Sequence, residues 1–236
     1  MKKREEKRLE LISNIYLGKQ FDIDKQLVRF RYKTIKKYFK GDECLEIGTA
    51  EGIMTKSLVK DFKKVTCIEP SKNLLKKIND YKNLIKINCL FENFKPNKKF
   101  STIILDHVLE HVKSPTKFLS KIYKLLDKKG IFIVGVPNAD SIHRLVAVEM
   151  GILRKKNTLN ITDLNLGHRR VYTRNMLSKV LIKNNFKIKK FEGIFLKTMS
   201  NAQINDYFDN KMINGFYKVG KKFPNYCADI CFICKK

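Results

Sequence analysis

The chain has 236 residues, 43% of them hydrophobic, which suits one α/β domain with a full core and excludes a disordered chain. Its longest apolar run, Ile131 to Val136, is far shorter than the roughly 20 residues that a membrane helix needs. The charged N-terminus is not followed by the apolar segment of a signal peptide. We therefore predict a cytoplasmic protein with no transmembrane segment, either a monomer or a homodimer.

The charge is strongly basic. Lys and Arg number 50 against 23 Asp and Glu, which gives a net charge of +27. Such an excess is typical of proteins that bind nucleic acid or acidic small molecules. However, only nine of the 50 are Arg, and the lysines are spread through every segment. A coding bias toward Lys is the alternative interpretation, and the sequence leaves both open.

Two of the six cysteines, Cys231 and Cys234, form a CxxC pair. A zinc site needs a second pair of ligands nearby, and the sequence has no second CxxC. The pair lies in the apolar string 227–234, which is typical of a buried strand. We predict that these cysteines are structural and that the chain has no metal site.

The predicted elements begin with two helices, 4–18 and 25–39, where apolar residues recur at helical spacing. We expect residues 1–40 to form an N-terminal helical cap or lid. Tyr16 and the aromatic residues between Phe21 and Tyr32 could cover a cofactor there, with core packing as the alternative.

Strands and helices then alternate along the rest of the chain. The predicted strands are 43–48, 65–69, 84–88, 101–106 and 131–136, and the helices between them are 50–62, one capped by Ser71, and 114–127. This alternation predicts parallel strands joined by right-handed crossovers in a doubly wound sheet. A helix at 173–184, a strand at 187–197, a helix at 202–218 and a strand at 227–235 predict an antiparallel edge.

A glycine-containing turn follows the first predicted strand, in the string Leu45-Glu-Ile-Gly-Thr-Ala-Glu-Gly52. Glu69 ends the second strand, 21 positions after Gly48, where a carboxylate can accept hydrogen bonds from ribose hydroxyls. Together these features favour an adenosine-containing cofactor. Glu51 near the helix start would repel a pyrophosphate, which disfavours a dinucleotide.

At this point the sequence resembles the class I methyltransferases that use S-adenosylmethionine (SAM). The string 45–52 resembles their first motif, with Ala50 in place of the middle glycine, and Ile68-Glu-Pro-Ser71 resembles the second. Asp106-His-Val-Leu-Glu-His-Val112 resembles the fourth motif of the small-molecule branch, often written xxVLEHV. The resemblance implies a Rossmann-like seven-stranded, mostly parallel sheet in the order 3-2-1-4-5-7-6 with helices on both faces, and a methyltransferase domain over residues 41–236.

The same resemblance implies the residues that hold the cofactor, with Glu92 near the adenine amino group. The expected SAM-binding residues are Glu46, Gly48, Thr49, Ala50, Gly52, Glu69, Pro70, Phe91, Glu92, Asp106 and His107. After methyl transfer the same residues would hold the product, S-adenosylhomocysteine.

The second half resembles a bacterial subgroup often encoded with surface-polysaccharide genes, in the strings 136–144, 163–173 and 193–197. This resemblance implies a small, anionic acceptor such as a nucleotide-linked or phosphorylated sugar. We expect an acceptor-binding insertion at about 139–172, beyond the cofactor end of the sheet. Its expected acceptor-binding residues are Arg144, His168, Arg169, Arg170 and Tyr172.

A hydroxyl acceptor would need a base, whereas a neutral amine could rely on positioning alone. The expected catalytic candidates are His168, which is favoured, His107 and His143. His168 could instead cap the helix near Thr173, and His111 is more typical of a structural role.

Three other functions stay open. An RNA methyltransferase would use the basic surface directly, although nucleic acid is less favoured because Asp106-His-Val-Leu differs from the (N/D)PP(Y/F) string of amino-type enzymes. A nicotinamide-dependent enzyme is disfavoured by the glycine turn. A non-catalytic SAM-binding partner protein would keep the fold without turnover.

Overall fold

The N-terminal helices precede the sheet in a computed structural model that describes residues 2–18 and 22–236, with side chains for 5–13 and from 22 onward. Helix α1 spans Lys2–Gly18 and α2 spans Asp22–Ile35, followed by the short helix η1 (Lys36–Tyr38). Both predicted helices are confirmed. The expected lid aromatics Tyr16 and Phe21 lie outside the described side chains.

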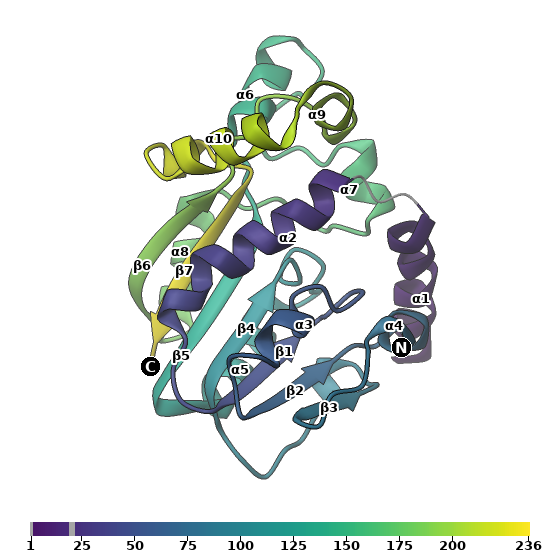
Figure 1. The fold of residues 1–236 in the computed structure, drawn as a ribbon, viewed down its shortest axis with the longest axis vertical. Coiled ribbons are helices and arrows are strands. Elements are labelled where there is room, and N and C mark those ends of the chain that lie inside the picture. The colour runs from purple at the N-terminus through teal and green to yellow at the C-terminus, as the bar shows by residue number, and fades with distance from the viewer. Residues whose placement is uncertain (1, 19–21) are drawn as a thin grey trace.

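Seven strands form one sheet in the order β3-β2-β1-β4-β5-β7-β6 (Figure 1). The strands are β1 (Glu43–Ile47), β2 (Lys64–Ile68), β3 (Leu84–Ile87), β4 (Phe100–Asp106), β5 (Leu126–Pro137), β6 (Lys187–Ile194) and β7 (Asp229–Lys235). Strands β1 to β5 pair in parallel, whereas β7 runs antiparallel to both β5 and β6. The predicted fold class, strand order and antiparallel edge are confirmed.

Helices pack on both faces of this sheet because its central strands are apolar on both sides. One core cluster joins the sheet to α5 (Pro115–Leu125) and α8 (Arg174–Lys183). The other joins it to α2, α3 (Thr55–Leu58), α9 (Asn201–Tyr207) and α10 (Asn210–Gly220). The smaller helices α4 (Lys72–Lys77), α6 (Ile142–Glu149), α7 (Ile161–Asn165), η2 (Phe91–Asn93) and η3 (Pro224–Tyr226) complete the fold.

Two predicted helices differ from the observed ones. The helix expected over 50–62 is limited to α3, because the preceding residues form a turn with positive φ angles at Gly48, Ala50 and Gly52. The helix expected over 202–218 is two helices, since Asp209 accepts a hydrogen bond from the Met212 amide (2.7 Å) and starts α10.

The cysteines of the CxxC pair are buried in β7 and face opposite sides of the sheet. Cys231 belongs to one core cluster and Cys234 to the other, and both thiols are free. Two side chains on opposite faces cannot chelate one ion, so the structural role predicted for them is confirmed. Within the described ranges, no helix combines the length and apolarity that crossing a membrane requires.

The segments beyond the carboxyl ends of the strands lie together. Helices α6, α9 and α10 gather at one end of the molecule, and α1 lies beside α4 at its edge (Figure 1). A bridge between Asn138 and Tyr172 ties the irregular segment 139–172 back to the end of β5. A cavity lies at this edge of the sheet.

Candidate active site

A cavity of about 1400 Å³ lies at the carboxyl ends of the parallel strands. The turn after β1, Glu69 after β2, His107 after β4 and Asn138 after β5 all line it. Open α/β sheets bind their ligands at this edge. Leu9 and Ile12 of α1 form part of the opposite wall.

The glycine turn requires backbone conformations that few residues adopt. Gly48 has a φ of 75°, and a Cβ there would lie 2.4 Å from Cγ2 of Val108. Only glycine fits that space, which brings the backbone against the cavity. Ala50 is left-handed as well, with a φ of 46°, which costs a non-glycine residue about 1 kcal/mol. Gly52 does not line the cavity and shapes the turn instead.

Glu69 braces this turn while facing the cavity. Its Oε2 accepts hydrogen bonds from the amides of Thr49 (3.1 Å) and Ala50 (3.2 Å), and its Oε1 accepts one from Ser71 (2.9 Å). Burial raises the pKa of Glu69 to about 7, although these three N–H groups oppose the shift. The expected ribose contact therefore comes from a carboxyl already bound to the turn.

Glu46 lies at the end of β1 and is almost completely buried. Its Oε2 accepts a hydrogen bond from the Thr55 hydroxyl at 2.6 Å. Burial raises its pKa to about 8, and the nearby carboxylates of Asp106 and Glu69 add to the shift. A cation in the cavity would favour ionisation of Glu46.

The wall expected to hold adenine is mostly apolar. Pro70, Phe91 and Glu92 line the cavity, and the Phe91 ring packs on Phe118 with centroids 4.6 Å apart. Lys121 fixes this segment by donating to the Phe91 carbonyl oxygen at 2.6 Å. With Gly52 excepted, every residue expected to bind SAM lines the cavity, so the residues fit an adenosine ligand that carries a cation.

Arg31 of α2 is a site residue that the sequence analysis missed. Its guanidinium donates to Oδ2 of Asp106 (2.7 Å) and to Oδ2 of Asp229 (2.9 Å). Burial alone would lower the pKa of Arg31, but the two carboxylates raise it above its usual value. Arg31 therefore stays charged and fixes the ends of β4 and β7 to each other.

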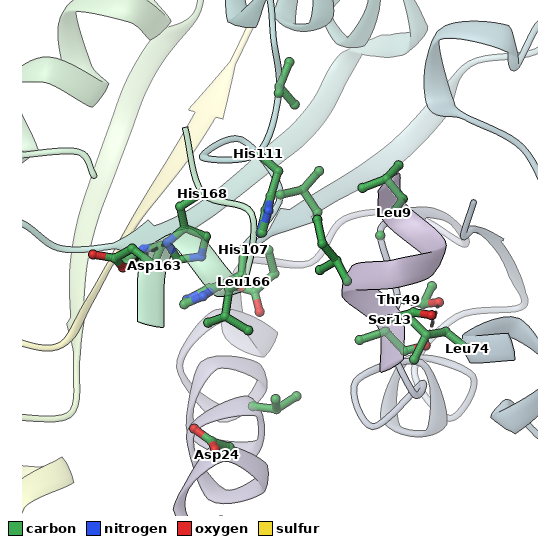
Figure 2. A pocket seen from close by; sticks show the side chains of 18 of the residues that line it. Leu9, Ser13, Asp24, Thr49, Leu74, His107, His111, Asp163, Leu166 and His168 are labelled. Carbon is green, nitrogen blue, oxygen red and sulfur yellow. Dashed lines mark hydrogen bonds and ion pairs between the residues drawn. The ribbon is translucent and has the colours of Figure 1, made fainter. Parts of the chain in front are cut away.

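All four histidines of the chain line this one cavity. Figure 2 shows His107, His111 and His168 together on one side of it, across from Leu9 and Thr49. His107 has a φ of 54°, and its Nε2 lies 3.3 Å from Oδ1 of Asp229. Burial and Arg31 lower the pKa of His107, but Asp229 outweighs them and the pKa is raised.

His168 is held by a carboxylate. Its Nδ1 lies 3.0 Å from Oδ1 of Asp163, and its ring meets the His111 ring edge-on at 4.8 Å. It does not cap the following helix, because the hydroxyl of Thr173 accepts the Met176 amide at 3.1 Å. Asp163 keeps a pKa of about 2 because His168 and other donors outweigh its burial.

His143 and His111 are in less polar surroundings. Burial lowers the pKa of each to about 3, with Lys197 adding to the shift at His143 and His168 at His111. No hydrogen-bond partner reaches Nδ1 of His143 within the described residues. Both imidazoles are therefore neutral near pH 7.

The arginines expected to bind the acceptor use their donors within the protein. Arg144 donates to the carbonyl oxygens of Lys156 and Thr158 and to Asp163. These bonds fix the segment between α6 and α7, although Arg144 still lines the cavity.

Arg169 and Arg170 bind the loop after β4. Arg169 donates to the His111 carbonyl oxygen (2.9 Å) and pairs with Glu5 of α1 (3.3 Å), whereas Arg170 donates to the Val112 carbonyl oxygen (2.5 Å). Neither Arg170 nor Tyr172 is among the described residues that line the cavity, and Tyr172 is buried. Any contribution of these two to acceptor binding would be indirect.

The cavity is less basic than the rest of the chain. Among the residues that the structure describes, nine Asp and Glu line it, but only seven Lys and Arg. Among them, Lys197 has no ion pair within the described residues, and burial lowers its pKa. The +27 charge therefore lies mostly outside the cavity.

Solved structures share this fold. A SAM-dependent methyltransferase from Archaeoglobus fulgidus has a TM-score of 0.59 at 19% identity, with 90% of this chain and 94% of that chain covered. A 1,6-didemethyltoxoflavin-N1-methyltransferase from Burkholderia thailandensis, solved with bound 1,6-didemethyltoxoflavin and S-adenosylhomocysteine, has a TM-score of 0.61 at 13% identity, with 91% of this chain and 80% of that chain covered. These likenesses show that the chain shares the fold of these enzymes.

The model of the methyltransferase domain family matches residues 21–190, and the chain belongs to that family. It is therefore a SAM-dependent methyltransferase. A protein named ubiquinone biosynthesis O-methyltransferase from Pelagibacter ubique is 25% identical over 179 residues, 73% of each chain. One of the same name from Rickettsia bellii is 27% identical over 150 residues, 58% of this chain and 62% of that protein.

Proposed function

We propose that this enzyme methylates a hydroxyl group of a small acceptor. The observation that carries the proposal is the placement of two carboxylate-paired imidazoles, His107 with Asp229 and His168 with Asp163, in the cavity lined by the glycine turn. An amine can react through positioning alone, whereas a hydroxyl must lose a proton. The O-methyltransferase names of the sequence relatives support the same reaction.

His107 is the base that the geometry favours. Its side chain is 26% exposed toward the cavity, against 6% for His168. It directly follows Asp106, at the strand end where the resemblance places SAM, and Asp229 stabilises its protonated form. His168, which the sequence favours, and His143 are the other candidates.

SAM, when bound, supplies a methyl group on a sulfonium that is already a good leaving group. The protein then has to align the acceptor oxygen, accept its proton and exclude water. His107 would accept the proton, and Arg31 would keep Asp106 and Asp229 in place beside it.

We also propose that α1 acts as the lid expected for residues 1–40. Arg8 Nη2 donates to the Gly167 carbonyl oxygen at 2.6 Å, and Glu5 pairs with Arg169. Ile12 packs so closely on Gly167 that a Cβ there would meet its side chain at 2.3 Å. These contacts join α1 to the segment that holds His168, and they would separate when a ligand enters.

The acceptor proposed from the sequence, a nucleotide-linked or phosphorylated sugar of surface-polysaccharide synthesis, has limited support in the cavity. Lys25, Lys113 and Lys197 are the lining cations left to meet a phosphate, because the lining arginines are bound to carboxylates or carbonyl oxygens. A hydroxylated aromatic acceptor, in keeping with the names of the relatives, is the first alternative.

The test is a screen for methylated product by mass spectrometry, with sugar nucleotides, sugar phosphates and dihydroxybenzoates as acceptors. We expect His107→Gln to lower kcat about 100-fold or more, with a much smaller change in SAM affinity measured by calorimetry. The same substitution at His168 and at His143 ranks the three candidates. Wild-type turnover in His107→Gln would exclude it as the base, and transfer only to amines would exclude the proposed reaction.

A further inference from the structure

Glu110, His111 and His168 converge on one point of the cavity wall. One ligand atom from each side chain lies within 4.8 Å of the other two. The first two come from the loop after β4 and the third from the segment after α7, 57 positions further along the chain. Figure 2 shows the two imidazoles side by side at this wall.

Glu110 is a buried carboxyl whose oxygens the protein does not satisfy. It is completely buried, and neither of its oxygens has a hydrogen-bond partner in the part of the chain that the structure describes. The nearest ring nitrogens are Nδ1 of His107 at 3.7 Å and Nε2 of His111 at 4.0 Å. A buried carboxyl without a partner is costly, so its position favours a ligand of positive charge.

His168 is oriented as metal-binding imidazoles are. Its Nδ1 lies 3.0 Å from Oδ1 of Asp163, which leaves Nε2 free to point elsewhere. Asp163 is itself fixed, because its Oδ2 accepts the Asn160 amide (3.0 Å) and pairs with Arg144 (3.1 Å). A carboxylate that orients a histidine in this way is the usual outer partner of a metal ligand.

We propose that Glu110, His111 and His168 bind one divalent transition-metal ion, of the class of Zn²⁺, Mn²⁺, Fe²⁺ or Co²⁺. Two imidazoles and one carboxylate suit these ions, whereas Mg²⁺ and Ca²⁺ prefer oxygen ligands alone. Ligands held at about 2.1 Å from a metal lie about 3–3.5 Å apart, so binding would draw the three side chains together.

The site would keep an open side toward the cavity. His111 and His168 line the cavity wall, while Glu110 is fully buried and is not among the lining residues. Three protein ligands with an open position are typical of catalytic rather than structural metal sites. The open position faces the space in which an acceptor would lie.

At this position the metal would bind the oxygen of the acceptor hydroxyl, an inference that rests on the proposed function. An oxygen bound to a divalent cation loses its proton more readily. In the transfer, the O–CH₃ bond would form as the S–CH₃ bond of SAM breaks, and the hydroxyl proton would pass to His107. His168 would then be a metal ligand, and His107 the base.

Metal binding can be measured without SAM or acceptor. Chelator-treated protein is titrated calorimetrically with Zn²⁺, Mn²⁺ and Mg²⁺, and Co²⁺ absorption reports the ligand number. We expect one equivalent of Zn²⁺ or Mn²⁺ per chain and much weaker binding of Mg²⁺. Glu110→Gln and His168→Gln should each lower Zn²⁺ affinity more than tenfold, and Asp163→Asn should lower it about tenfold.

His143→Gln is the matched control, because it removes an imidazole from the same cavity outside the cluster and should keep the wild-type Zn²⁺ affinity. Thermal melting and SAM binding verify that each variant is folded. If Glu110→Gln does not fold, His168→Gln still tests the site. Absence of Zn²⁺ and Mn²⁺ binding by the wild type, or equal affinity in all variants, would overturn the site. Metal binding without methylation of any hydroxyl acceptor would support the metal site but refute the proposed function.

Discussion

Replacing Glu46 with Gln should stabilise the protein, and increasingly so as the pH rises. The carboxyl is buried, and its pKa is about 8 in the fold against 4.5 for a free glutamate side chain. Between these values the native state holds a proton that the unfolded state has released. Stability therefore falls as the pH rises from 4.5 through 8.

The magnitude follows from these two pKa values. Each unit of difference is worth about 1.4 kcal/mol, so the cost of Glu46 is below about 1 kcal/mol at pH 5 and about 4 kcal/mol at pH 8. The side-chain amide introduced by Glu46→Gln would still accept from the Thr55 hydroxyl and would not titrate. A constant offset from burying that amide cancels when two pH values are compared.

The assay is urea unfolding at pH 5, 7 and 8, followed by circular dichroism. The free energy of unfolding of Glu46→Gln minus that of the wild type should grow by about 3 kcal/mol between pH 5 and pH 8. Glu149→Gln, on the exposed face of α6, is the matched control and should show no such growth. A difference that stays constant with pH would refute the assignment of a raised pKa to Glu46.

Three further predictions concern the cofactor half. The first uses 5′-methylthioadenosine, which has the ribose of SAM but no amino acid. The pKa of Glu69 is about 7, so affinity for this ligand should fall about tenfold per pH unit below pH 7. In calorimetric titrations, Glu69→Gln should abolish this pH dependence. Gly48→Ala should lower unfolding free energy by at least about 2 kcal/mol, whereas Gly151→Ala, with a similar φ but open space, should cost about 1 kcal/mol in urea titrations. Arg8→Ala removes the bond to Gly167 and should speed SAM release several-fold in stopped-flow experiments; an unchanged rate would argue against a lid.

The cofactor half could be predicted from the sequence because its residues lie in short strings at strand ends. Gly48 and Glu69 each follow a buried apolar run, and parallel strands bring such ends to one edge of the sheet. The helix expected over 50–62 was too long because apolar spacing carries no information on φ. The turn occupies the first residues of that pattern. Ala50 has a positive φ, which an alanine in a sequence does not indicate as a glycine does.

The acceptor half could not be predicted in the same way, since its contacts join distant segments. Arg31 lies on an ordinary amphipathic helix, 75 positions from Asp106 and 198 from Asp229. The sequence favoured Arg144 and Arg170 as free donors, yet carbonyl oxygens and carboxylates of the protein use their N–H groups. Only the folded chain shows which donors are already bound.

The charge of the cavity bears on what it can attract. Acidic residues outnumber Lys and Arg along its wall, although the chain as a whole carries +27. Buried carboxyls such as Glu46 and Glu110 are costly by themselves, and a cation that enters would offset this cost. The sulfonium and amino groups of SAM are such cations, and a metal at Glu110 would be another. The interior therefore favours positive charge, and an anionic acceptor would have to rely on the lysines that line the cavity, Lys25, Lys113 and Lys197, or on a cation bound before it.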